Sequence, residues 1–169
     1  FHFLPSGSVG IPPVVSVYLD LAFRYAHDHS MEVPGVRTDI HFWSLIGDSE
    51  FREGSLMEAM PDAAERQLGN VTWIVDYNRQ NLDGARMPNM HGLYGTDADR
   101  IERSTQANGW EVIQVRHGSV RKGLFKRNGG RALRAILEEG FSDYELQALL
   151  LMRDMDEARR LFIGMDDKV

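Results

Sequence analysis

Residues 41–50 read His-Phe-Trp-Ser-Leu-Ile-Gly-Asp-Ser-Glu, an apolar run that stops at a glycine and an acidic residue. A second apolar run, Val-Thr-Trp-Ile-Val at residues 71–75, is followed closely by Asn78. Nearly continuous apolar runs of this length are typical of parallel strands buried on both faces. Ligands of open α/β sheets bind beyond the carboxyl ends of such strands. We therefore expect Asp48 and Asn78 to meet at one edge of a sheet.

Asp48 and Asn78 carry the kinds of oxygen atom that a hard cation prefers. Magnesium takes six oxygen ligands, and here one would come from a carboxylate, one from an amide, and the others from a backbone carbonyl, phosphate and water. Each residue also has a simpler interpretation. Asp48 can cap the helix that follows it, and Asn78 can serve as a turn residue after a strand.

The rest of the chain alternates strands with helices. Helical spacing predicts a helix over 14–29 with Pro13 in its first turn, and another over 52–68 that Pro61 kinks or divides and Gly69 caps. The order predicts an α/β fold, a three-layer α/β/α arrangement around a mainly parallel sheet, in one domain over 1–169. The other expected elements are strands over 40–46, 71–77 and 110–116, and helices over 97–107, 130–139 and 142–162.

Two helix starts carry capping signals, and one connection is unusually long. Thr96 or Asp97 is expected to cap the helix over 97–107, and residues 142–145, Ser-Asp-Tyr-Glu, match a capping box. The loop over 78–94 is rich in glycine, proline and asparagine. Long loops inside compact domains are often functional, so this loop is expected to lie near a site.

Composition excludes several classes of function. The net charge of −6 argues against nucleic-acid binding, and the basic stretch over 116–134 is interpreted as solvated surface. The chain has no cysteine, which excludes disulfides and thiol chemistry and fits a reducing compartment, so we expect a cytoplasmic protein. No apolar run is long enough for a membrane span. His27 and His29 lie at a predicted helix end, where they are interpreted as complementing the helix dipole rather than binding metal.

The motif resembles the thiamine diphosphate signature, in which Gly-Asp-Gly precedes a distant Asn; here Asn78 follows Asp48 by 30 residues. The resemblance extends over about residues 3–141 and includes Glu-Gly-Ser-Leu-Met-Glu-Ala at 53–59. The family is the transketolase-like group of thiamine diphosphate enzymes. The segments Asn-Arg-Gln-Asn-Leu-Asp-Gly at 78–84 and Ala-Asn-Gly-Trp-Glu-Val-Ile at 107–113 are most similar to the homodimeric pyruvate dehydrogenase first component.

The resemblance implies roles for individual residues. The metal ligands would be the Asp48 carboxylate, the Asn78 side-chain oxygen and the Gln80 backbone carbonyl. No catalytic residue is assigned, because the glutamate that activates the cofactor in this family comes from a different domain across a subunit interface. Ser49 and Val9 depart from the family pattern, which usually has glycine and a bulkier apolar residue there. The implied cofactor-binding residues are Ser8, Val9, Gly47, Asp48, Ser49, Glu50, Asn78 and Leu82.

The implied activity is the thiamine diphosphate- and magnesium-dependent oxidative decarboxylation of pyruvate, with acetyl transfer to a lipoyl group. The implied partners are a second copy of the full-length chain and a lipoyl-bearing acyltransferase. Because the chain begins at Phe1 inside a motif, we expect a piece of a longer multidomain protein that is inactive alone. The alternatives are a transketolase moving a two-carbon unit between sugar phosphates, a magnesium-dependent phosphohydrolase or nucleotide-binding domain, and a non-enzymatic scaffold.

Overall fold

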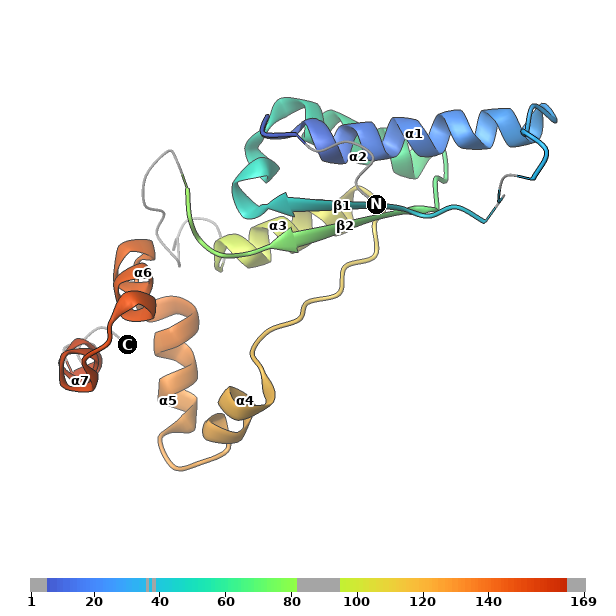
Figure 1. Ribbon diagram of the computed structural model, residues 1–169. Helices are drawn as coiled ribbons and strands as arrows, with labels where there is room; N and C mark the ends of the chain where they lie inside the picture. The colour runs from blue at the N-terminus through green and yellow to red at the C-terminus, as the bar shows by residue number, and fades with distance from the viewer. Residues whose placement is uncertain (1–5, 36, 38, 82–94, 164–169) are drawn as a thin grey trace. The chain divides into compact units, whose positions relative to one another are not determined.

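The computed structural model describes residues 6–35, 37, 39–81 and 95–163 (Figure 1). The chain divides into two compact units, Phe1–Asn78 with Ser104–Glu111, and Arg79–Arg103 with Val112–Val169. Each unit has a hydrophobic cluster of its own. The organisation of residues 1–169 as one domain stays a prediction.

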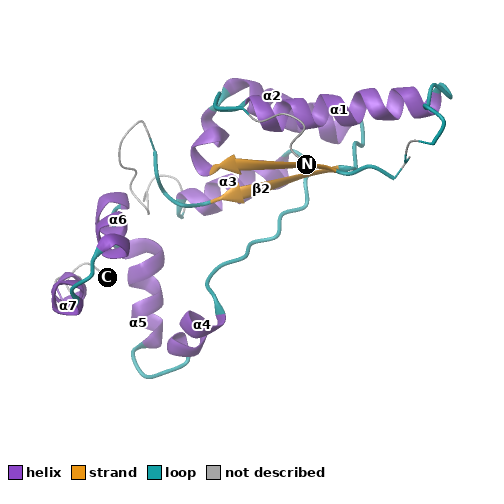
Figure 2. Cartoon of the chain, in the orientation of Figure 1, coloured by secondary structure: helices purple, strands orange, loops and turns teal. Residues whose placement is uncertain are grey.

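The first unit is built on a pair of parallel strands. β1 (Phe42–Gly47) pairs with β2 (Val71–Asp76) in a register that runs from Phe42 opposite Val71 to Gly47 opposite Asp76. The helices α1 (Ile11–Asp28) and α2 (Gly54–Glu65) lie on one side of these strands (Figures 1 and 2). Their core joins Val17, Ala59, Ala63 and Val71. The α/β class and the parallel pairing are therefore confirmed.

The two faces of β1 differ in exposure. Ser44 and Ile46 are buried on the face that α1 and α2 cover, whereas Trp43 and Leu45 are 64% and 71% exposed. Ile74, opposite Leu45 in β2, is 47% exposed on the same uncovered face. The prediction that the strand is buried on both faces is therefore wrong for these residues, because α1 and α2 pack on one face only.

The ends of α2 differ from the predicted ends. A 3₁₀ turn, η1 (Asp48–Arg52), comes first, and α2 then runs without a break through Pro61 to Glu65. Gln67, with φ 55°, takes the left-handed position, and the Leu68 N–H donates to the Ala63 carbonyl at 3.0 Å. This hydrogen-bond pattern closes a helix in the Schellman manner. The predicted cap at Gly69 is wrong by two residues, and the helix is not divided at Pro61.

The segment predicted as a third strand, 110–116, is not a strand. The sheet in the described residues consists of β1 and β2, and residues 110–116 belong to no strand. Trp110 is fixed by a ring contact with Trp73 and by donation from its Nε1 to the Met60 carbonyl at 2.9 Å. Beyond it, Ile113 and Val115 are 80% and 91% exposed. An alternating apolar pattern makes a strand only where a neighbouring edge supplies hydrogen-bond partners.

The second unit is helical in its described residues. Its helices include α4 (Ser119–Phe125), α5 (Gly130–Ala135), the π-helical turn η2 (Ile136–Gly140), α6 (Asp143–Leu151) and α7 (Met155–Ile163). Ile136 and Phe141 form its core with leucines of η2, α6 and α7. The capping box at Ser142 and Glu145 is confirmed. The expected helix over 142–162 is wrong in part, because it breaks between α6 and α7, and α4 was not predicted.

The helix α3 (Asp97–Ala107) contributes residues to both units and matches its predicted bounds. The Asp99 N–H donates to the Thr96 Oγ1 at 3.3 Å, and the Thr96 N–H donates to the Asp99 Oδ2 at 2.8 Å. Thr96 is therefore the cap. Gly109, with φ 83°, follows the end of the helix, and its N–H donates to the Gln106 carbonyl at 3.0 Å. Within the described ranges, no helix combines the length and the apolar character needed to cross a membrane.

Candidate functional site

The carboxyl ends of β1 and β2 form the edge at which the site was predicted. The last paired residues are Gly47 and Asp76, so Asp48 comes one residue after the pairing ends and Asn78 comes two residues after it. Parallel strands present their carboxyl ends on the same side. The structure therefore brings the two predicted metal ligands to one edge of the sheet, as the sequence indicated.

Asp48 is a buried carboxylate at this edge. Its exposed fraction is 2%, and it is the first residue of η1. Its Oδ1 accepts a hydrogen bond from the Ser49 N–H at 3.0 Å. A buried carboxylate is costly unless hydrogen bonds or a cation compensate it. Asp48 thus has the donor chemistry and the burial of a ligand for a hard cation.

Glu50 bridges two segments that lie 40 residues apart in the sequence. Its Oε1 accepts from the Gly47 N–H at 2.9 Å, and its Oε2 accepts from the Gly10 N–H at 2.8 Å. Hydrogen bonds to a carboxylate are stronger than those to a neutral acceptor. The Glu50 side chain therefore ties the residue before Asp48 to the start of α1.

The loop over Ser8–Gly10 is held by this bridge. Gly10 has φ 84°, and a Cβ placed there would lie 2.8 Å from both Cβ and Cγ of Glu53. The Ser8 carbonyl accepts from the Ile11 N–H at 3.4 Å as α1 begins. Ser8 is exposed and Val9 is 46% exposed. The structure thus brings this loop beside Gly47 and leaves the apolar Val9 side chain open to a ligand.

Ser49 replaces the glycine that is usual in the resembling signature. Ser49 is not among the residues with positive φ. A non-glycine side chain is therefore accommodated without backbone strain. The substitution leaves the Ser49 backbone N–H in place, as its hydrogen bond to Asp48 shows.

Asn78 is exposed at the edge, and its side-chain nitrogen donates to the Asp76 Oδ2 at 3.2 Å. The oxygen is the acceptor atom of this amide and is therefore the atom with the chemistry of a metal ligand. Gln80 belongs to the second unit, where its Nε2 donates to the Gln147 Oε1 at 2.9 Å. Leu82 lies outside the described residues, so its predicted place near a cofactor stays a prediction.

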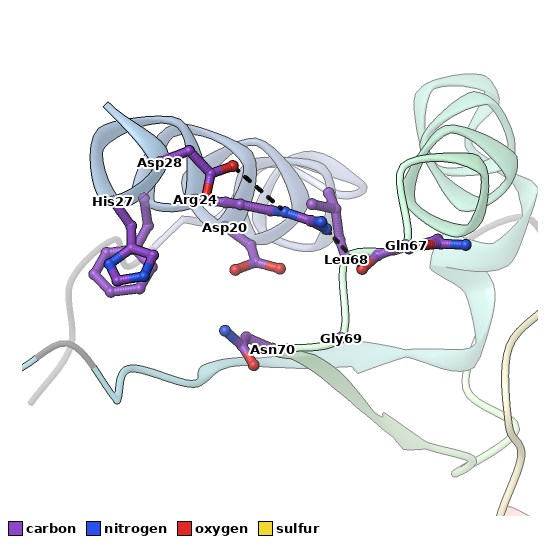
Figure 3. A pocket seen from close by; sticks show the side chains of 9 residues that line it. Asp20, Arg24, His27, Asp28, Gln67, Leu68, Gly69 and Asn70 are labelled. Carbon is purple, nitrogen blue, oxygen red and sulfur yellow. Dashed lines mark hydrogen bonds and ion pairs between the residues drawn. The ribbon is translucent and has the colours of Figure 1, made fainter. Parts of the chain in front are cut away.

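A polar hollow lies at the other end of the sheet (Figure 3). It has a volume of about 350 Å³ and lies between the end of α1 and the turn that precedes β2. Arg24 lines it and donates from its Nη1 to the carbonyls of Arg66 and Gln67, both at 3.0 Å. These bonds satisfy carbonyls at the end of α2, which is a structural role. The sequence reasoning did not predict this hollow, and it contains none of the predicted site residues.

The donor set at the carboxyl edge fits magnesium. Asp48 supplies a carboxylate and Asn78 an amide oxygen, which are both ligand types that magnesium accepts. Among the described residues, no three His, Cys, Asp or Glu side chains gather into a metal-binding group. The predicted set does not require such a group, because it combines one carboxylate with an amide, a backbone carbonyl and oxygens from a diphosphate.

Comparison with known proteins identifies the family. The family described as transketolase, thiamine diphosphate binding domain, matches residues 10–126. The chain belongs to this family. The thiamine diphosphate binding domain here includes Gly47–Glu50, Asn78 and Gln80, and its matched segment begins at Gly10, which the Glu50 bridge holds.

The thiamine diphosphate binding domain is similar to proteins named pyruvate dehydrogenase E1 component. That of Mycolicibacterium smegmatis is 30% identical over 115 residues, which are 68% of this chain and 12% of the relative. That of Corynebacterium glutamicum is 27% identical over 168 residues, 99% of this chain and 17% of the relative. That of Escherichia coli K12 is 25% identical over 146 residues, 86% of this chain and 16% of the relative. The chain thus spans less than a fifth of the length of these relatives.

Proposed function

We propose that this chain holds the diphosphate and the magnesium ion of thiamine diphosphate in an enzyme that decarboxylates pyruvate oxidatively and passes the acetyl group to a lipoyl group. The observation that carries the proposal is the parallel pairing of β1 with β2, which puts Asp48 and Asn78 beyond the same sheet edge. The choice of pyruvate is supported by the relatives, whose names are those of pyruvate dehydrogenase components.

The proposed metal ligands are the Asp48 carboxylate, the Asn78 side-chain oxygen and the Gln80 backbone carbonyl. Two diphosphate oxygens and a water would complete the six ligands that magnesium requires. The buried Asp48 carboxylate offsets the positive charge of the cation, and the Ser49 N–H orients that carboxylate. The Gln80 side chain is engaged with Gln147, which agrees with a ligand role for its backbone rather than for its side chain.

The remaining proposed cofactor residues shape the space around the diphosphate and the rings. Glu50 holds the Ser8–Gly10 loop against Gly47, and Val9 offers an apolar surface to a ring. Leu82 is assigned by resemblance. When bound, thiamine diphosphate supplies the electron sink on which decarboxylation of a 2-keto acid depends. The residues of this chain bind and orient that group.

We propose that the chain is inactive by itself. In the resembling family, the glutamate that activates the cofactor comes from another domain across a subunit interface, and no residue of this chain matches it. The partners we propose are a second copy of the full-length protein and a lipoyl-bearing acyltransferase. Turnover by a purified protein of residues 1–169 would contradict this part of the proposal.

The experiment uses the full-length protein with thiamine diphosphate and magnesium. Pyruvate-dependent reduction of an artificial electron acceptor is expected. A ketose-phosphate donor with an aldose acceptor is tested in parallel, because the description of the matched family names transketolase. Transfer of a two-carbon unit without a response to pyruvate would replace the proposal by the transketolase reaction, and no activity in either assay would contradict both.

A further inference from the structure

Arg79 occupies an unusual place between two proposed metal ligands. It follows Asn78 and precedes Gln80, and its side chain is only 7% exposed. Its φ is 60°, in the left-handed region that residues with a Cβ rarely adopt. Strained backbone of this kind persists only where its surroundings hold it, and it concentrates at functional sites.

Two hydrogen bonds hold the Arg79 side chain in the second unit. Its Nε donates to the Asp143 Oδ1 at 2.7 Å, and its Nη2 donates to the Phe141 carbonyl at 2.5 Å. The Asp143 side chain is also only 7% exposed, and Phe141 is fully buried. Asp143 is the first residue of α6, where a negative charge is favoured by the helix dipole.

The residue after Arg79 is tied to the same helix. The hydrogen bond from Gln80 to Gln147 joins it to the second turn of α6. The side chains of two consecutive residues therefore hold this segment. Arg79 bonds to the first residue of α6, and Gln80 bonds to a residue one turn further along the same helix. Phe141, Asp143 and Gln147 lie beyond the residues 10–126 that the family match covers.

A buried ion pair contributes little net stability compared with apolar packing, because both charges lose their hydration. Its more useful effect is directional, since an arginine with two fixed acceptors has few remaining orientations. Magnesium tolerates little departure from octahedral geometry. The backbone on either side of Arg79 carries the Asn78 side chain and the Gln80 carbonyl, so its geometry decides whether both can coordinate together.

We propose that the buried Arg79–Asp143 ion pair positions the backbone between Asn78 and Gln80 for magnesium coordination. This inference rests on the proposed function. Arg79 and Asp143 are positioning residues, since they act on the metal through Asn78 and Gln80. Both positioning residues belong to the second unit, and Asp143 lies 65 residues after Asn78 in the sequence.

The test compares Asp143→Asn with Asp99→Asn in the full-length protein. Asp99 is the control because it forms an ion pair with Arg116 at 2.9 Å in the same unit, and its side chain is 35% exposed where that of Asp143 is 7% exposed. In the cofactor-free protein, D143N is expected to raise amide hydrogen exchange over residues 78–81 by about tenfold, as local opening becomes easier, whereas D99N leaves it unchanged. With thiamine diphosphate present, D143N is expected to raise the magnesium Kd by about 10- to 100-fold.

A second variant separates positioning from simple loss of folding. The double variant R79M/D143L removes both charges, so it leaves no unpaired buried charge and is expected to fold. It lacks the two directional hydrogen bonds, so the magnesium Kd is again expected to rise. An unchanged exchange rate and an unchanged magnesium Kd in a folded D143N or R79M/D143L protein would overturn the inference.

The two proposals fail in different ways. A wild-type protein that binds thiamine diphosphate with magnesium, together with variants that bind equally well, would overturn the positioning role alone. A wild-type protein that binds neither would overturn the proposed function and the role of the ion pair at the metal with it. Faster exchange and weaker magnesium binding in both variants, with D99N unchanged, would establish the positioning role.

Discussion

Two buried aspartates lie at opposite ends of the first unit, and they differ in what surrounds them. Asp48 and Asp20 are each 2% exposed. Asp48 follows the carboxyl end of β1, whereas Asp20 of α1 lies in the hollow with Asn70, just before β2 begins (Figure 3). Burial raises the pKa of Asp20, while the Asn70 N–H and the charges of Arg24 and His41 act in the opposite direction.

The two ends differ in how many features of the proposed binding site they carry. The hollow of about 350 Å³ lies at the Asp20 end, yet its residues close the end of α2 and none of them belongs to the signature. The Asp48 end has the direction of the strands, the Gly47–Glu50 turn and the bridged loop. We therefore assign the proposed site from the direction of the strands rather than from the hollow.

Replacing Asp48 and Asp20 in turn should give the largest difference in cofactor binding between the two ends. Asp48→Ala in the full-length protein is expected to weaken magnesium-dependent binding of thiamine diphosphate by more than the roughly 10- to 100-fold that loss of an outer-shell residue costs. Asp20→Ala is the control and should leave binding unchanged. Isothermal titration calorimetry measures both. Equal effects of the two substitutions would remove the distinction between the two ends.

The Glu50 bridge is a second feature that the Asp20 end lacks. In Glu50→Gln, one of the two backbone N–H groups would face an NH₂ group instead of an acceptor, so the free energy of unfolding should fall by about 1–3 kcal/mol. Cofactor affinity should fall as well, since the Ser8–Gly10 loop is released from Gly47. Chemical denaturation and calorimetry measure the two effects. Glu58→Gln, on the exposed side of α2, is the control. If the Glu50→Gln protein had the same free energy of unfolding and the same cofactor affinity as this control, the role of the Glu50 bridge would be contradicted.

Gly10 tests the other side of the same bridge. Gly10→Ala is expected to lower the free energy of unfolding by at least about 1–2 kcal/mol, because a left-handed φ is unfavourable for alanine. The added Cβ would also meet Glu53 at 2.8 Å. Gly54→Ala at the start of α2 meets nothing within 4 Å and should be neutral or stabilising. Thermal unfolding of the two variants would show equal stability if the Gly10 conformation were unimportant.

The smallest expected effect lies at the Asp20 end. Because burial raises the pKa of Asp20 above its ordinary value of 3.8, the folded state binds more protons than the unfolded state between the two values. Stability should therefore fall as pH rises through this range. The Asp20→Asn side chain keeps an acceptor oxygen but does not titrate. Its free energy of unfolding should therefore exceed that of the wild type increasingly as pH rises above the ordinary pKa of Asp20, and the difference should then become constant. Denaturant unfolding at several pH values would contradict this if both proteins had the same profile.

Local patterns in the sequence predicted much of the first unit. Periodicity and apolar runs identified α1, β1, β2 and α3, because each depends on residues that are close in sequence. The segment over 110–116 shows the limit of this reasoning. Its apolar alternation is that of a strand, but strand formation depends on an available edge, which no local pattern specifies. The predicted end of α2 was also wrong. Gln67 takes the left-handed position that Gly69 was expected to take.

The sequence predicts which residues lie at the candidate site but not which contacts hold them there. Gly47, Asp48 and Asn78 could be found from spacing, because strand direction brings them to one edge. Glu50 was singled out, but its bond to Gly10 spans 40 residues, and the bond from Arg79 to Asp143 spans 64. Such pairings depend on tertiary packing. The sequence shows that Arg79 lies beside Asn78, but it does not show that the Arg79 side chain is buried. The pairing of Arg79 with Asp143 could therefore not be predicted.

The most direct test of the central claim is a crystal structure of the full-length protein with thiamine diphosphate and magnesium. The account predicts a magnesium ion about 2.0–2.1 Å from the Asp48 carboxylate, the Asn78 side-chain oxygen and the Gln80 carbonyl, with diphosphate oxygens completing the coordination. A magnesium ion bound elsewhere, for example against Asp20 in the hollow at the other end of the sheet, would contradict it.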